Sequence, residues 1–119
     1  MLYIIDSDKI MAECIAKATG EEVKIFANAI EAMNEISYGE LPEIIFMEIM
    51  LDGPDGFSFL NELISYDDTA KIPVVIVSSL PFVKKNLDVY GVVGVLNKET
   101  MTPEEIRRYV DECTKRNQD

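Results

Sequence analysis

The stretch that decides the fold runs from Pro42 to Phe57 and reads Pro-Glu-Ile-Ile-Phe-Met-Glu-Ile-Met-Leu-Asp-Gly-Pro-Asp-Gly-Phe. Near its start is a short apolar run, Ile44 to Met47, with a charged residue on each side. Such a run predicts a strand that is buried on both faces, as the strands of parallel sheets are. The run stops at the carboxylate of Glu48. Because functional groups of open α/β sheets gather outside the carboxyl ends of the strands, Glu48 is the first candidate for a functional acid.

The rest of the chain alternates apolar runs with helical patterns. Further strands are predicted at Leu2 to Ile5, Val23 to Phe26, Val74 to Val77 and Val92 to Leu96. Between the strands, apolar residues recur at helical spacing: Ile10, Met11, Cys14, Ile15 and Ala18 in the first helix; Ile30, Met33 and Ile36 in the second; Phe57, Leu60, Leu63 and Ile64 in the third; Ile106, Tyr109, Val110 and Cys113 in the last. The segment from Pro81 to Tyr90 is a further, short helical candidate.

Several helix boundaries are marked by residue type. Asn28 is a predicted N-cap, and Gly20 and Gly39 are predicted C-terminal stops. Thr102 to Glu105 has the pattern of a capping box with Pro at the first helical position. Five strands that alternate with five helices predict a single α/β domain, residues 1–119, with a flavodoxin-like (βα)5 doubly wound parallel sheet in the strand order 2-1-3-4-5.

Composition and charge exclude several classes of function. The net charge of −11 argues against nucleic-acid binding by this domain and against binding to anionic membranes, since both require clustered Lys and Arg. We interpret the acidity as favouring solubility over an acidic docking face. No apolar run is long enough to span a membrane, and the chain start lacks the basic region of a signal peptide, so a cytoplasmic location is expected. Cys14 and Cys113 form no CxxC pair and there is no His, so we expect buried free thiols and no zinc site.

Polar groups follow four of the five predicted strands: Asp6-Ser7-Asp8, Glu48, Ser78 and Lys98. In the order 2-1-3-4-5 these four strands are neighbours, so the polar groups are expected to meet in one crevice. The carboxylates could bind a hard cation, and the hydroxyl and the ammonium could bind phosphoryl oxygens. Each residue alone is commonly a solvated side chain or a helix cap, and the joint placement is what indicates a site.

On these segments the chain resembles the receiver domain of two-component response regulators. The resemblance covers almost the whole chain, and the matching segments are Tyr3 to Asp8, Pro42 to Phe57, Ile72 to Ser78 and Leu96 to Lys98. It implies a signalling domain and not an enzyme, in which an Asp after the third strand accepts a phosphoryl group from a histidine kinase. It also implies an acidic pair that helps to bind Mg²⁺, a Ser or Thr that contacts the phosphoryl group and a Lys that pairs with it.

Two departures from the family pattern fall in the site itself. Glu48 stands at the acceptor position, and Ser7 stands in the second place of the acidic pair, whereas Asp6, Ser78 and Lys98 match. A Glu carboxylate lies roughly 1.5 Å farther from the backbone than that of Asp, and such a displacement slows in-line transfer. Ser7 removes a charge from the cation site. We therefore expect no cofactor and at most weak Mg²⁺ binding, at Asp6. Other departures are Glu99, Val95 and Asp52, where the family often has Pro, an aromatic residue and Pro.

The resemblance thus implies an atypical receiver that works without phosphorylation, by contact with protein partners. The expected contact face is formed by the fourth helix, the fifth strand and the fifth helix, roughly Phe82 to Arg116. Charged residues of the last helix are available for ion pairs across a homodimer, or are simply solvated: Arg107, Arg108, Asp111 and Glu112. A monomer and a dimer are both compatible with the sequence.

Two interpretations of Glu48 stay open at this point. In one, Glu48 pairs with Lys98 and accepts a hydrogen bond from Ser78, which would hold the site near the activated arrangement. In the other, Glu48 is a remnant in an inactive site and makes only a structural pair with Lys98. A further hypothesis is a conventional receiver in which Glu48 still accepts the phosphoryl group, or Asp52 replaces it.

A hypothesis of another class is an enzyme. Asp6-Ser7-Asp8 also resembles the opening of haloacid-dehalogenase-type phosphatases, in which Asp6 would be the nucleophile, Asp8 the general acid–base and Mg²⁺ the electrophile. No further acidic metal-binding motif follows Lys98, and the chain has no room for a cap domain. This hypothesis therefore ranks below the receiver.

Overall fold

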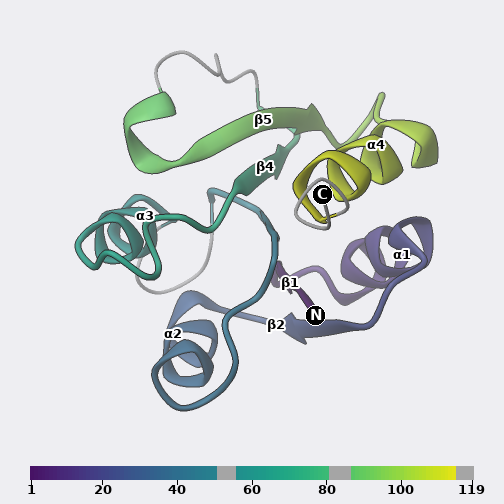
Figure 1. Cartoon of the computed structure of the whole chain (residues 1–119). Helices are drawn as coiled ribbons and strands as arrows, with labels where there is room; N and C mark the ends of the chain where they lie inside the picture. Colours follow the sequence, from purple (N-terminus) through teal and green to yellow (C-terminus); the bar gives the residue numbers. More distant parts are fainter. Residues whose placement is uncertain (51–55, 81–86, 115–119) are drawn as a thin grey trace.

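A five-stranded parallel sheet forms the centre of the computed structural model, which describes residues 1–50, 56–80 and 87–114 (Figure 1). The strands are β1 (Leu2–Ile5), β2 (Val23–Phe26), β3 (Ile45–Met47), β4 (Val74–Ser78) and β5 (Val92–Asn97). Their order is β2-β1-β3-β4-β5, and every neighbouring pair is parallel. The predicted flavodoxin-like topology is confirmed.

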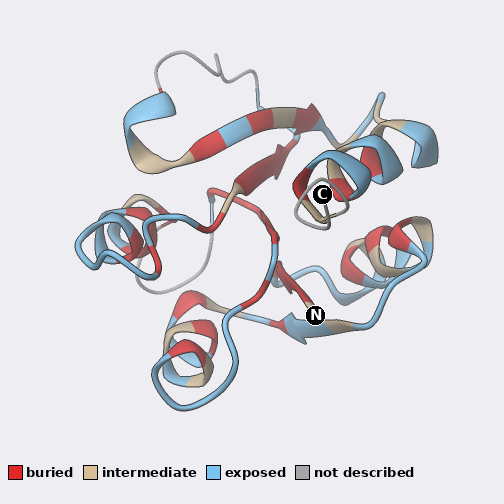
Figure 2. Cartoon of the chain, viewed as in Figure 1, coloured by how far each residue is buried: buried red, intermediate tan, exposed pale blue. Residues whose placement is uncertain are grey.

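Two of the described α-helices cover each face of the sheet. In Figure 1, α2 (Ala29–Tyr38) and α3 (Gly56–Ile64) lie to the left of the strands, and α1 (Lys9–Thr19) and α4 (Pro103–Thr114) lie to the right. Successive strand residues point to opposite faces, so each strand supplies both layers of the core. In β1, Leu2 and Ile4 pack toward α1 and α4, whereas Tyr3 and Ile5 pack toward α2 and α3. Figure 2 shows the central strands buried along their whole length.

The helices begin at the caps that the sequence marks. The side chain of Asn28 accepts a hydrogen bond from the Glu31 N–H at 2.9 Å. At the start of α4, the Glu105 N–H donates to the Thr102 hydroxyl at 3.2 Å, and the Thr102 N–H donates to the Glu105 carboxylate at 2.9 Å. This is the reciprocal pair of a capping box. Gly20 ends α1 with a φ of 67°, a left-handed conformation that favours glycine.

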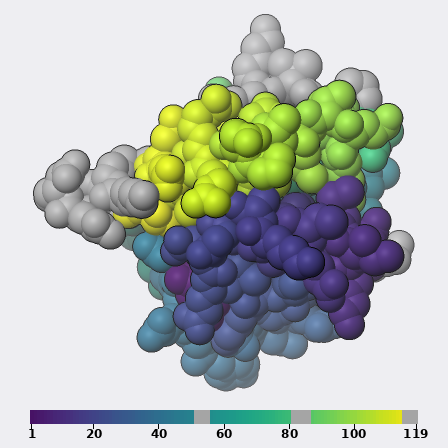
Figure 3. Space-filling view, turned by 90° about the vertical axis from the view of Figure 1, so that its right-hand side faces the viewer, coloured from purple at the N-terminus to yellow at the C-terminus, as the bar shows by residue number. Residues whose placement is uncertain are grey.

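The layer of α1 and α4 is closely packed. Figure 3 looks onto this side of the molecule and shows α4, in yellow, lying against α1, in dark blue and purple. The ring of Tyr109 in α4 covers Gly94 of β5 so closely that a Cβ at position 94 would overlap the ring. Glycine at this position therefore lets α4 approach the edge strand.

Among the described helices, none is both long and apolar enough to cross a membrane.

Some details of the helices differ from the sequence-based predictions. Of the candidate helix from Pro81 to Tyr90, residues 81–86 lie outside the described part, and Asp88–Tyr90 forms a short 3-10 helix. Ile10, Ile30 and Ile64 were expected on buried stripes but are exposed. Cys113 is buried as predicted, whereas the prediction of a buried Cys14 is wrong. The reason is that α1 buries the stripe of Ala12, Ile15 and Thr19, and Cys14 lies beside that stripe, on the solvent side.

Candidate functional site

The four predicted site positions lie together at the carboxyl edge of the sheet. Asp6, Glu48 and Lys98 each follow the last residue of their strand, and Ser78 is the last residue of β4. Backbone hydrogen bonds extend the sheet by one residue at these positions: Asp6 N–H to Phe26 O at 2.9 Å, Glu48 N–H to Ile5 O at 2.9 Å, and Lys98 N–H to Ser78 O at 3.0 Å. The sheet itself therefore fixes the point from which each side chain starts.

One ammonium group bridges two carboxylates in this crevice. The Lys98 Nζ lies 2.8 Å from Asp6 Oδ2 and 3.0 Å from Glu48 Oε1. The three side chains are 12%, 3% and 11% exposed, so water screens these contacts far less than it screens a surface ion pair. Two carboxylates and one ammonium leave the network with one negative charge.

The remaining oxygens of the site hold the loops that leave the strands. Asp6 Oδ1 accepts a hydrogen bond from the Asp8 N–H at 2.9 Å, and Glu48 Oε2 accepts one from the Met50 N–H at 3.1 Å. In the same way Ser78 Oγ accepts from the Leu80 N–H at 3.2 Å, and Asn97 Oδ1 accepts from the Glu99 N–H at 2.7 Å. At four strand ends a side chain thus binds the backbone two residues ahead, as in Asx and related turns.

Burial and charge act in opposite directions on Lys98. Burial disfavours the ammonium, but the contacts with the carboxylates of Asp6 and Glu48 outweigh it and raise the pKa of Lys98 above its ordinary value. Asp6 Oδ2 is buried and faces the Lys98 ammonium, and no other donor among the described residues reaches this oxygen. Removal of the ammonium would leave Asp6 Oδ2 with no partner in this part of the chain.

Three predicted candidates do not take part in the ion network of Lys98, Asp6 and Glu48. Ser7 is exposed. Asp8 is also exposed, and its Oδ1 accepts the Met11 N–H at 3.1 Å as the N-cap of α1. The Ser78 hydroxyl lies at the crevice, but no hydrogen bond joins it to Glu48 within the described residues. Asp52, the other acceptor candidate, lies outside the described residues.

The fit of a divalent cation can be judged from the side chains that are present. Mg²⁺ prefers several oxygen ligands in octahedral geometry. In the described ranges no group of three or more Asp, Glu, His or Cys side chains is placed to hold a metal ion. The two carboxylates of the crevice already face the Lys98 ammonium. A divalent cation would therefore have to displace the Lys98 ammonium to reach these two carboxylates.

Asn97 was not a candidate in the sequence analysis. Its side chain completes the set of four strand-end turns, and it positions the backbone beside Lys98. The sequence could have predicted this turn, because Asn at the end of an apolar strand commonly accepts a hydrogen bond from the backbone N–H two residues later.

No protein-family model and no curated protein matches this chain. Solved structures do match it over almost its whole length. The receiver domain of NtrX from Brucella abortus is 17% identical, with 97% of this chain and 98% of that chain covered and a TM-score of 0.83. A two-component response regulator from Clostridium difficile is 20% identical, with 99% and 98% covered and a TM-score of 0.81.

A third match is the receiver domain of a sensor histidine kinase from Pseudomonas aeruginosa, which has a magnesium ion coordinated in its active site cleft. It is 17% identical, with 94% of this chain and 95% of that chain covered and a TM-score of 0.74. From these matches and from the strand order, the chain has the fold of response regulator receiver domains.

Proposed function

We propose that residues 1–119 form an atypical receiver domain of a two-component-type signalling protein, which acts in the cytoplasm by contact with other proteins and without phosphorylation. The observation that carries this proposal is the Lys98 ammonium held between Glu48 and Asp6. The basic group that would pair with a phosphoryl group is already neutralised by side chains of the chain itself.

The arrangement of Glu48 opposes phosphoryl transfer. An acceptor carboxylate must present one oxygen in line with the donor, and a misplacement of about 1 Å can lower the rate about a hundredfold. One oxygen of Glu48 accepts the Met50 N–H and the other faces Lys98, and the residue is 9% exposed. Neither oxygen is positioned to attack a donor unless these contacts break.

Cation binding is weakened for a separate reason. The Pseudomonas receiver named above has magnesium in its cleft. At the corresponding place in our proposal, Asp6 is paired with Lys98, and Ser7 contributes an exposed hydroxyl in place of a carboxylate. A cation would have to displace the ammonium to reach Asp6, so we propose that Mg²⁺ binds weakly or not at all.

Between the two interpretations of Glu48, we favour a structural ion network over a mimic of the phosphorylated state. A mimic would use both the ammonium of Lys98 and the hydroxyl of Ser78. Glu48 makes the first contact, whereas the Ser78 hydroxyl binds the Leu80 N–H. The crevice would then keep one arrangement permanently, and the domain would present one fixed surface to its partners.

For that surface we propose the face around β5 and α4. Arg107, Arg108 and Glu112 are exposed there and can pair with charges of a partner or of a second copy. The predicted extension of this face toward Phe82 and Arg116 lies outside the described residues.

No observation favours the phosphatase hypothesis. In that hypothesis Asp8 would be the general acid–base, but its carboxylate caps α1.

The test is incubation of the purified chain with a small-molecule acyl-phosphate donor and Mg²⁺, followed by intact mass measurement. We expect no gain of a phosphoryl group. The matched control is the double variant Ser7→Asp, Glu48→Asp, which restores the shorter acceptor and the second metal ligand. This variant should bind Mg²⁺ and gain one phosphoryl group.

A phosphoryl group on the wild-type chain would overturn the proposal, and its position would show whether Glu48 or Asp52 accepts it. Failure of the double variant to bind Mg²⁺ would instead mean that the residues of the site are wrongly assigned. Turnover of a generic phosphate ester that Asp6→Asn abolishes would favour the phosphatase.

A further inference from the structure

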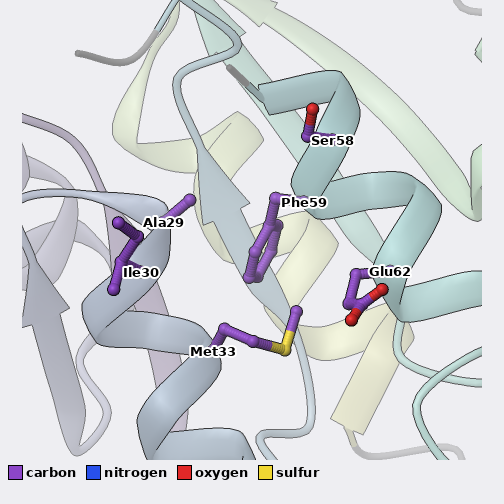
Figure 4. Close-up of a pocket in the computed structure, with 6 residues that line it drawn as sticks. All are labelled: Ala29, Ile30, Met33, Ser58, Phe59 and Glu62. Carbon is purple, nitrogen blue, oxygen red and sulfur yellow. The ribbon is translucent and has the colours of Figure 1, made fainter. Parts of the chain in front are cut away.

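An open furrow runs between α2 and α3, on the face of the sheet opposite α1 and α4. Its first part is a hollow of about 290 Å³ between the two helices (Figure 4), lined by Ala29, Ile30, Met33, Ser58, Phe59 and Glu62. A second hollow of about 300 Å³ shares Met33 and Glu62 with the first and continues to Tyr66 and Thr69. The two hollows adjoin at these shared residues, and we name them together the α2–α3 furrow.

The α2–α3 furrow has an apolar floor that is open to solvent. In Figure 4, the Phe59 ring lies between the helices, and the Met33 side chain reaches from α2 toward α3. Ile30 and Tyr66, which line its two parts, are 54% and 59% exposed. Its α2 side extends from Ala29 to Ser37, roughly 12 Å or two helical turns at 1.5 Å per residue. This matches the length of a helical side-chain stripe with anchors at i, i+4 and i+7.

The segment that contains α2 and α3 carries charge of one sign. From residue 25 to residue 70 the chain has ten acidic residues and no Lys or Arg, whereas the other residues together have twelve acidic and eleven basic side chains. The net charge of −11 therefore arises almost entirely from the segment that contains α2 and α3.

The acids that line the furrow have no basic partner among the described residues. No described Lys or Arg lies within ion-pair distance of Glu62 or Asp68. Other acids of the same segment do have partners, as Glu35 pairs with Lys24. In Figure 4, the Glu62 carboxylate faces the furrow across from Met33.

From this combination we infer that the α2–α3 furrow is a docking groove for a cationic amphipathic helix of a partner protein. The apolar stripe of such a helix would cover Ile30 and Met33 above the buried Phe59 ring, and its flanking Lys and Arg would lie near Glu62 and Asp68. The same face of a second copy of this chain would bring the same acidic segment and be repelled. Nucleic acid and anionic membranes are excluded by the same charge.

This surface is separate from the proposed function of the crevice. The inference uses no residue of the ion network and does not depend on whether Glu48 accepts a phosphoryl group. The phosphodonor experiment can therefore fail while the docking groove stands, and the reverse also holds.

The test uses a fluorescent peptide of about 18 residues, or five helical turns, with a stripe of Leu at helical spacing and Lys on the flanks. Its control has the same composition in an order that destroys the stripe. Fluorescence anisotropy with the full chain should show that the striped peptide binds at least about tenfold more tightly than the control, a difference of about 1.4 kcal/mol. Equal binding of the two peptides would overturn the inference.

Matched variants locate the binding site. Ile30 and Ile10 are both exposed and both occupy the second position of their helix, but only Ile30 lines the furrow. Ile30→Ser should weaken binding at least about fivefold, as the loss of an apolar anchor does, and Ile10→Ser should leave it unchanged. Likewise Glu62→Lys should weaken binding. Glu13→Lys changes the net charge by the same amount at an exposed position of α1 and should have little effect.

Two further results would count against this groove. If Glu62→Lys and Glu13→Lys weaken binding equally, the peptide responds to the net charge of the protein and not to the furrow. If the unliganded chain sediments as a dimer that Ile30→Ser converts to a monomer, a second copy occupies the furrow and the inferred partner is wrong.

Discussion

The carboxyl-edge crevice and the α2–α3 furrow differ in whether their charged and apolar side chains have partners within the described chain. In the crevice, Asp6 and Glu48 share the ammonium of Lys98, and the three side chains are almost completely buried. In the furrow, apolar side chains such as Ile30 stay in water, and neighbouring acids such as Glu62 have no basic partner in the described chain. In the crevice the charged groups pair with one another, whereas in the furrow apolar surface and acids lack a partner among the described residues.

This difference indicates where a binding partner can gain free energy. A ligand of the crevice must first break the contacts of a buried ion network, and this costs more than it would at the surface. A ligand of the furrow displaces only water from apolar surface and brings opposite charge to unpaired acids. If both proposals hold, a partner gains more free energy at the furrow than at the carboxyl-edge crevice.

The largest expected effect comes from opening the crevice. Lys98→Met removes the ammonium but leaves two carboxylates, of which Asp6 is 3% exposed. Breaking a buried pair in this way leaves uncompensated charge and commonly costs 3–5 kcal/mol, so we expect a loss of about 3 kcal/mol in the free energy of unfolding. Urea titration of the wild-type chain and the variant measures this loss.

Lys24→Met is the matched control, because Lys24 also pairs with a glutamate but lies at the surface. Exposed pairs contribute little, so this change should lower stability much less than Lys98→Met does. Adding Glu48→Gln to Lys98→Met should recover part of the loss, since it removes one of the two like charges. Equal effects of Lys98→Met and Lys24→Met would contradict the closed crevice.

The second prediction concerns the loss of the Lys98 charge at high pH. The pKa of Lys98 is raised in the folded chain above its ordinary value of 10.5, so the folded state holds this proton more tightly than the unfolded state does. The stability that Lys98 contributes is therefore complete below pH 10.5 and lost as the pH rises through the folded pKa. The difference in unfolding free energy between wild type and Lys98→Met should be constant from pH 7 to pH 9 and shrink above pH 10.5. A difference independent of pH up to pH 12 would show that the ammonium is not its source.

The sheet and its polar edge were predictable from the sequence, because four of the five strands are short apolar runs that end at a polar residue. With the order 2-1-3-4-5 confirmed, the positions after β1 and β3 are neighbours, whereas β4 separates β5 from β3, so the Lys98 side chain reaches past β4 to contact Asp6 and Glu48. The sequence did not predict that Lys98 would contact both carboxylates and leave Ser78 to a turn, since this depends on the reach of individual side chains.

Helix orientation was the weaker part of the sequence analysis. Periodicity predicts that α1 has an apolar stripe, but Ile10 and Ala12 lie on different stripes, and the packing of α1 against the sheet and α4 decides which one is buried. Likewise the separation of α2 and α3, which creates the furrow, is a tertiary property. The charge of the segment that forms the furrow can be read from the sequence, because residues 25–70 contain no Lys or Arg. The net charge of −11 alone does not show this uneven distribution.

The smallest expected effect tests whether the furrow is open in solution. Ile30 is 54% exposed, so Ile30→Ser removes little buried surface and should change the free energy of unfolding by no more than about 0.5 kcal/mol. Ile36, on the same helix, is 8% exposed, and Ile36→Ala should cost about 2 kcal/mol through lost burial and the cavity left behind. Denaturant titration of both variants gives the comparison. If Ile30→Ser cost as much as Ile36→Ala, α2 and α3 would close over Ile30 in solution, and its contribution to peptide binding could not be separated from folding.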